Sequence, residues 1–113
     1  MDLTTRKVDN IFVINVDGDI DSDTSSMFKK SLNYALGRGE RNILLNFENV
    51  NFITSVGIGV IIDLYKQLDK NNGKLVLVKV RKLVRDVLEV SRLDSVFQIM
   101  DTESEAIRSM SES

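Results

Sequence analysis

Apolar residues follow two alternating patterns along the chain. Continuous runs of aliphatic and β-branched residues indicate buried strands. These runs lie at positions 11–16, 42–47, 74–78 and 96–100. We expect the short polar segment before them, at positions 7–10, to form a first strand. Between the runs, apolar residues recur every three or four positions, which predicts amphipathic helices. The helices are expected around positions 27–36, 60–68, 83–88 and 103–110.

The expected order of elements is β-β-α-β-α-β-α-β-α. Strands that alternate with helices favour an α/β fold with a mostly parallel sheet. The first two strands are joined too tightly for a crossover, so we expect them to pair antiparallel at one edge of the sheet. No linker, repeat or low-complexity segment interrupts residues 1–113, and a chain of this length can bury one core. The sequence therefore predicts a single domain.

Positions 52–60 follow a predicted core strand and lead into a helix, a place where open α/β sheets commonly meet ligands and partners. We expect Ser55 to be the N-cap of that helix, with Gly57 and Gly59 in its first turn. Each glycine costs about 1 kcal/mol of helix stability relative to alanine. One interpretation is a plain capped helix packed tightly on its sheet. The other is an anion site, or an anion attached covalently to Ser55, stabilised by free N–H groups and the helix dipole.

The composition excludes several kinds of chemistry. The chain has no His and no Cys, which rules out a Ser-His-Asp triad, a Cys nucleophile, a disulfide and imidazole or thiolate metal ligands. Because the usual base for activating Ser55 is missing, chemistry at that serine should be carried out by another protein. Gly57 and Gly59 do not begin a dinucleotide fingerprint, because the third glycine position is Ile62. We expect a protein with no enzyme activity, no metal and no cofactor.

Charge and hydropathy limit the kinds of partner that the protein is expected to bind. Fifteen Lys and Arg against 17 Asp and Glu give a formal net charge of −2, which does not favour nucleic acid. No signal peptide is visible, and the longest apolar run, 56–62, is far shorter than the ~20 residues that span a bilayer. We therefore expect a cytoplasmic protein without membrane contact. A monomer or weak dimer is expected, because no long exposed apolar stripe is left after the core is assigned.

Three segments, in this order and at this spacing, carry a family resemblance. They are Gly18-Asp19-Ile20-Asp21, positions 43–47 followed by Val50-x-Phe52-Ile53, and Thr54-Ser55-Val56-Gly57-Ile58-Gly59. Further similarity continues through 72–74 and 91–97. Over nearly its whole length the chain resembles the STAS-domain anti-sigma factor antagonists, also called anti-anti-sigma factors.

The resemblance implies a partner switch. In this family the unmodified protein binds an anti-sigma factor that is also a serine kinase, and this binding releases a sigma factor. The kinase then phosphorylates the serine that corresponds to Ser55, the complex dissociates, and a metal-dependent serine phosphatase restores the active form. ATP and Mg²⁺ belong to the kinase. The partner-binding residues implied here are Asp21, Ser22, Thr54, Ser55, Val56, Gly57 and Ile58.

Two motif positions depart from the family pattern. Thr54 stands where the family usually has Asp, and Val56 replaces a small residue. Thr54 adds a second hydroxyl and is a secondary candidate for phosphorylation. Two alternative functions stay open: a STAS-type scaffold that recruits partners without a phosphate cycle, and a small nucleotide-binding domain.

Overall fold

The computed structural model describes residues 1–111, and within them it contains five strands, four α-helices and one 3-10 turn. The strands are β1 (Asp2–Val8), β2 (Ile11–Asp17), β3 (Asn42–Asn49), β4 (Lys74–Val78) and β5 (Gln98–Met100). The helices are α1 (Ser25–Gly37), α2 (Ser55–Lys70), α3 (Lys82–Val90) and α4 (Glu103–Ser111), and the 3-10 turn is η1 (Leu93–Ser95). This succession confirms the order expected from the sequence.

The strands form one sheet in the order β1-β2-β3-β4-β5. β1 pairs antiparallel with β2, and every later neighbour pair is parallel. The predicted fold class is therefore confirmed, including the antiparallel hairpin at the edge. β2, β3 and β4 are parallel neighbours, so their carboxyl ends lie at the same end of the sheet. The connections that leave these three strands therefore gather at one end of the molecule.

Two strands begin at residues other than those predicted. The first strand was expected at 7–10, but β1 begins at Asp2, and Asp9 and Asn10 form the turn into β2. As an edge strand β1 is mostly polar and exposed, so no apolar run marks it; its pairing with β2 over the whole of Asp2–Val8 defines it instead. The last strand, expected at 96–100, begins only at Gln98, after the η1 turn.

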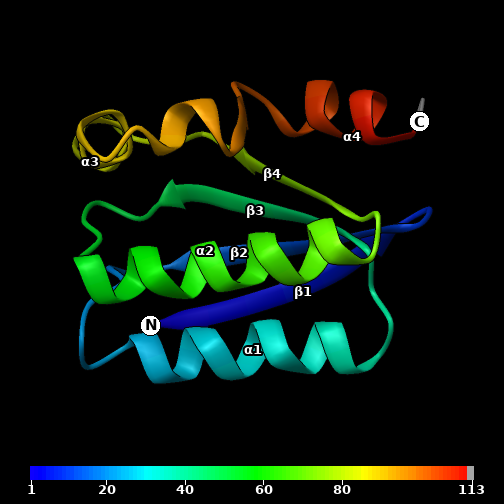
Figure 1. Cartoon of the computed structure of the whole chain (residues 1–113), viewed down its shortest axis with the longest axis horizontal. Helices are drawn as coiled ribbons and strands as arrows, with labels where there is room; N and C mark the ends of the chain where they lie inside the picture. Colours follow the sequence, from blue (N-terminus) through cyan, green and yellow to red (C-terminus); the bar gives the residue numbers. More distant parts are fainter. Residues whose placement is uncertain (112–113) are drawn as a thin grey trace.

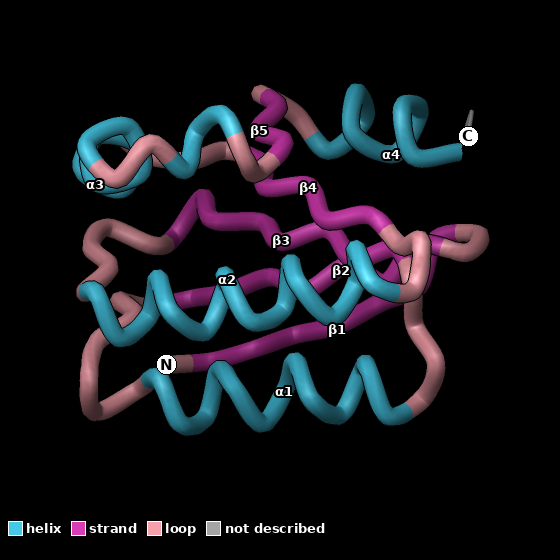
Figure 2. The backbone as a smooth tube through the Cα atoms, viewed as in Figure 1, coloured by secondary structure: helices cyan, strands magenta, loops and turns pink. Residues whose placement is uncertain are grey.

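The helices cover the two faces of the sheet unequally (Figures 1 and 2). α1, α2 and α3 pack on one face, where their apolar residues join alternate strand residues in the larger core. α4 alone packs on the other face, where Ala106 and Met110 meet the intervening strand residues. Successive residues of a strand point to opposite faces, so Ile11 and Val13 belong to the α4 side, whereas Phe12 and Ile14 belong to the larger core. α1 and α2 lie side by side along the sheet (Figure 1).

Candidate partner-binding site at the start of helix α2

The connections after β2 and β3 are joined to each other by their backbones. The N–H of Ile20 donates to the carbonyl of Phe52 at 3.0 Å, and the N–H of Thr54 donates to the carbonyl of Ile20 at 2.9 Å. Ile20 and Ile53 form an isolated parallel bridge between these hydrogen bonds, and both side chains are buried. The two motifs singled out in the sequence, about thirty residues apart, therefore meet at one end of the molecule.

Asp21 holds the first of these connections in a defined turn. Its Oδ1 accepts hydrogen bonds from the N–H groups of Asp23 at 2.9 Å and Thr24 at 3.0 Å. In return, the N–H of Asp21 donates to the Thr24 hydroxyl at 3.0 Å. The backbone hydrogen bonds from Thr24 and Asp23 favour the ionised carboxylate and hold the pKa of Asp21 below its ordinary value of 3.8. Asp21 is half-buried and Ser22 is exposed, so both lie at the surface with a fixed backbone.

Thr54, not Ser55, is the N-cap of α2, so the prediction for Ser55 is wrong. Thr54 has an extended backbone, and its hydroxyl accepts a hydrogen bond from the N–H of Gly57 at 3.5 Å. The first intrahelical bond runs from the N–H of Ile58 to the carbonyl of Thr54 at 2.9 Å. Ser55 is therefore the first residue inside the helix. The shift follows from the bridge at Ile53, because the extended backbone continues one residue beyond it.

Ser55 lies on an exposed surface with an apolar border. It is exposed itself, and no hydrogen bond joins its hydroxyl to any part of the chain that the structure describes. Phe52 and Val56 on either side of it are 48% and 50% exposed. At the start of a sixteen-residue helix, the free N–H groups and the helix dipole favour negative charge. The surface thus combines one accessible hydroxyl with two exposed apolar side chains.

Gly57 and Ile58 lie under this surface and not on it. Both are buried, and Ile58 belongs to the main core. A Cβ at position 57 would lie 2.6 Å from Cγ2 of Ile20 and 2.8 Å from Cγ1 of Ile53, so only glycine allows the helix to approach the bridge this closely. The tight-packing interpretation therefore holds for Gly57. Gly59 has no such neighbour within 4 Å.

The structure brings five of the expected contact residues to one surface: Asp21, Ser22, Thr54, Ser55 and Val56. Gly57 and Ile58 are buried beneath this surface and support it from below. Phe52 was not among the contact residues expected from the sequence, yet its exposed side chain belongs to this surface. The available signal was an aromatic residue in the connection between a predicted strand and a predicted helix.

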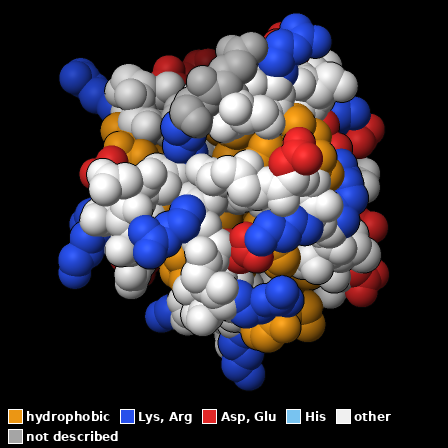
Figure 3. Space-filling model, turned by 90° about the vertical axis from the view of Figure 1, so that its right-hand side faces the viewer, with side chains coloured by type: hydrophobic (Ala, Val, Ile, Leu, Met, Phe, Trp, Pro, Cys, Tyr) orange, Lys and Arg blue, Asp and Glu red, His pale blue; other side chains and the backbone are white. Residues whose placement is uncertain are grey.

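Neither a cluster of metal-ligating residues nor a membrane-spanning helix is found in the described part of the chain. Within residues 1–111, no three Asp or Glu side chains gather in a way that could hold a metal ion. None of the helices there is long and apolar enough to cross a bilayer. The end of the molecule opposite Ser55, seen in Figure 3, carries Lys and Arg side chains at several separate places.

Comparison with known proteins places this geometry in a family. A sequence model of the STAS domain matches residues 2–106. The chain belongs to the STAS domain family. This confirms the resemblance noted in the sequence, and the match covers both connections and the whole of α2.

Relatives of this STAS domain are named as anti-sigma factor antagonists. One is the anti-sigma F factor antagonist of Paenibacillus polymyxa, 29% identical over 98 residues that cover 86% of this chain and 84% of the relative. A crystal structure of a Thermotoga maritima protein, a candidate anti-sigma factor antagonist, superposes with a TM-score of 0.92 at 28% identity, covering 96% of this chain and 93% of that one. The Bacillus cell fate determinant SpoIIAA in its phosphorylated form gives a TM-score of 0.76 at 26% identity, covering 95% and 97%.

Proposed function

We propose that this STAS domain is an anti-sigma factor antagonist that works by partner switching. Its unphosphorylated form binds an anti-sigma factor that is also a serine kinase, and this binding releases a sigma factor. Phosphorylation of Ser55 abolishes the binding. The observation that carries the proposal is the exposed Ser55 hydroxyl at the start of α2, between Phe52 and Val56 and beside the turn at Asp21. The names of the relatives support the same partner class.

Ser55 is the better phosphorylation candidate of the two neighbouring hydroxyls. The Thr54 hydroxyl is half-buried and already accepts the hydrogen bond from Gly57 that caps the helix. A kinase that modified Thr54 would have to break this cap, whereas the exposed Ser55 hydroxyl can enter a kinase active site with α2 intact. Thr54 serves the site by positioning Ser55.

A phosphate on Ser55 acts locally. It adds a charge of about −1.5 to −2 and three acceptor oxygens. The positive end of the α2 dipole stabilises that charge, so the domain stays folded. A partner that packs on Phe52 and Val56 and approaches a small neutral hydroxyl is repelled by the bulk and charge. The switch therefore needs no large conformational change.

The proposal assigns no catalysis, metal or cofactor to this chain. The kinase supplies ATP and Mg²⁺, and a separate serine phosphatase removes the phosphate. The domain acts as a monomer or weak dimer in the cytoplasm, without nucleic acid or membrane contact.

Binding to the cognate anti-sigma factor tests the proposal. Wild type, Ser55→Ala and Ser55→Asp are compared by calorimetry, with Ser104→Asp as a matched control. Ser104 is also exposed in the first turn of a helix, α4, but lies on the other face of the sheet. We expect Ser55→Ala and Ser104→Asp to bind as wild type and Ser55→Asp to lose binding. Equal binding by Ser55→Asp and wild type would contradict the proposal.

Intact-mass analysis after incubation with the kinase and Mg²⁺-ATP tests the phosphate cycle itself. We expect a gain of one phosphate, mapped to Ser55 and absent from Ser55→Ala. Tight binding without any gain in mass would instead favour a scaffold with no phosphate cycle. Phosphate on Thr54 would show that the cap opens in the kinase complex.

A further inference from the structure

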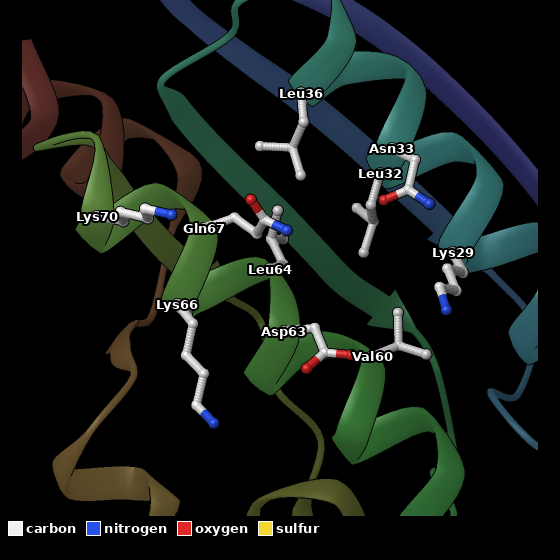
Figure 4. A pocket seen from close by; sticks show the side chains of 10 residues that line it. All are labelled: Lys29, Leu32, Asn33, Leu36, Val60, Asp63, Leu64, Lys66, Gln67 and Lys70. Carbon is white, nitrogen blue, oxygen red and sulfur yellow. The ribbon is translucent and has the colours of Figure 1, made fainter.

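A groove runs along the outer surface between α1 and α2 (Figure 4). It encloses about 480 Å³ and follows α2 from Val60 to Lys70. Eleven residues of helix correspond to about 16 Å, or three turns. Leu36 of α1 and Val60 of α2 are only half-buried, so the groove has an apolar floor that is partly open to water. Its polar lining includes the side-chain amides of Asn33 and Gln67.

The border of this groove is positively charged, although the chain as a whole is slightly negative. Lys29 of α1 and Lys66 and Lys70 of α2 line it, against the single carboxylate of Asp63. None of these three lysines is ion-paired with another residue in the described part of the chain. Their charges are therefore free for an external partner, and the net charge of the groove favours an acidic one.

We propose that the α1–α2 groove binds an acidic amphipathic helix of a partner protein. The apolar face of that helix packs on Leu36 and Val60, and its carboxylates lie near Lys29, Lys66 and Lys70. A helix fits better than a strand, because the groove lies between two helices and offers no open sheet edge for backbone pairing. The length of the groove matches about three turns of helix.

This docking site is separate from the Ser55 surface and goes beyond the proposed switch. Ser55 lies a full turn before Val60, and none of the residues that line the groove belongs to the two connections around Ser55. Phosphorylation of Ser55 and occupation of the groove therefore give independent signals in a binding experiment.

Two synthetic peptides can serve as probes in a ¹⁵N NMR titration. The first is a stapled three-turn helix with Leu on one face and Glu elsewhere, and the second carries Lys in place of each Glu. We expect the acidic peptide to shift the amide signals of α1 and α2 along the groove, and the basic peptide to shift none. Binding of the acidic peptide should weaken as salt is raised from about 0.05 to 0.5 M, because the charges are exposed.

Matched charge reversals test the location. Lys70→Glu and Lys30→Glu change the net charge equally and both positions are exposed, but Lys30 does not line the groove. We expect Lys70→Glu to weaken binding of the acidic peptide about three- to tenfold, Lys30→Glu to change it little, and Asp63→Lys to strengthen it. Ser55→Asp should leave peptide binding unchanged.

Three results of these peptide experiments would overturn the proposal. They are equal binding of the two peptides, shifts confined to another surface, and equal loss in Lys70→Glu and Lys30→Glu, which would indicate only long-range attraction. Binding of a single-stranded oligonucleotide in preference to the acidic peptide would also overturn it. Failure of the proposed switch would be seen in a different experiment, the calorimetric titration, as tight binding of Ser55→Asp to the anti-sigma factor.

Discussion

Replacing Gly57 with alanine, and comparing the result with the same change at Gly59, measures how tightly α2 is packed on the bridge beneath it. Both residues lie in the same helix two positions apart, so the gain in helix propensity, about 0.8–1 kcal/mol, is the same for both substitutions. The difference between the two variants therefore isolates the steric contacts made by the new methyl group.

The structure gives the size of that difference. A methyl group at position 57 would lie 2.6 Å from Cγ2 of Ile20 and 2.8 Å from Cγ1 of Ile53, whereas carbon atoms in contact are about 3.5–4.0 Å apart. Both atoms are attached directly to the Cβ of a buried β-branched side chain, so they cannot rotate away freely. Overpacking of this kind costs about 1–3 kcal/mol. At Gly59 no atom outside the neighbouring residues and the local helix backbone lies within 4 Å of an added methyl group, and this cost is absent.

We expect Gly59→Ala to be stabilised by up to about 1 kcal/mol and to be more stable than Gly57→Ala by about 1–3 kcal/mol. Urea unfolding followed by circular dichroism measures both free energies of unfolding. Because the bridge joins the Asp21 turn to the start of α2, Gly57→Ala should also weaken binding to the anti-sigma factor, and Gly59→Ala should not. Equal stability of the two variants would refute the assignment of Gly57 to close packing.

Three further predictions concern the N-cap Thr54, the turn held by Asp21 and the side chain of Glu103 in α4. Thr54→Ala should lower the free energy of unfolding by about 0.5–1 kcal/mol, whereas Thr54→Asp should keep it because Asp is also a good N-cap; urea unfolding distinguishes them. The carboxyl of Asp21 should titrate below ordinary aspartates in an NMR pH titration. Folding lowers the pKa of Asp21, so its ionised carboxylate stabilises the folded domain at pH values above its pKa in the unfolded chain. This stabilisation is lost as the pH falls through the lowered pKa of the folded domain. In Asp21→Ala, that part of the decrease in the free energy of unfolding at acid pH should disappear. Glu103→Ala should cost about 1–2 kcal/mol in urea unfolding, because it removes the partner of Asn46 and Arg6, while Glu105→Ala on the same helix should cost less.

Burial and hydrogen bonding shift the pKa of Glu103 in opposite directions. Burial of its carboxyl favours the neutral form, but hydrogen bonds from Asn46 and Arg6, with the charge of Arg6, outweigh burial and lower the pKa. The stability from Glu103 is therefore also lost as pH falls through its lowered pKa. A Glu103→Gln variant that kept the full acid dependence of wild type would contradict this account.

The sequence by itself determined the kinds of element, their order and the fold class. Continuous aliphatic runs marked β2, β3 and β4 because strands buried on both faces need apolar residues at every position. It failed at β1, since a polar edge strand carries no such run and is defined only by pairing with β2. The motif around Ser55 was visible in the sequence because its serine and glycines interrupt a helical pattern.

Only the tertiary structure decided how the residues of that motif are arranged. Thr54 is the N-cap of α2 because the extended backbone at the Ile20–Ile53 bridge continues through Thr54, so the helix begins at Ser55, one residue earlier than the sequence indicates. The same bridge decided that Gly57 is buried and Phe52 exposed, and it placed Asp21 beside the start of α2. The α1–α2 groove likewise appears only when two helices pack side by side. Local chemistry sets which conformations a segment favours, whereas contacts through space, absent from any window of sequence, set which side chains a partner can reach.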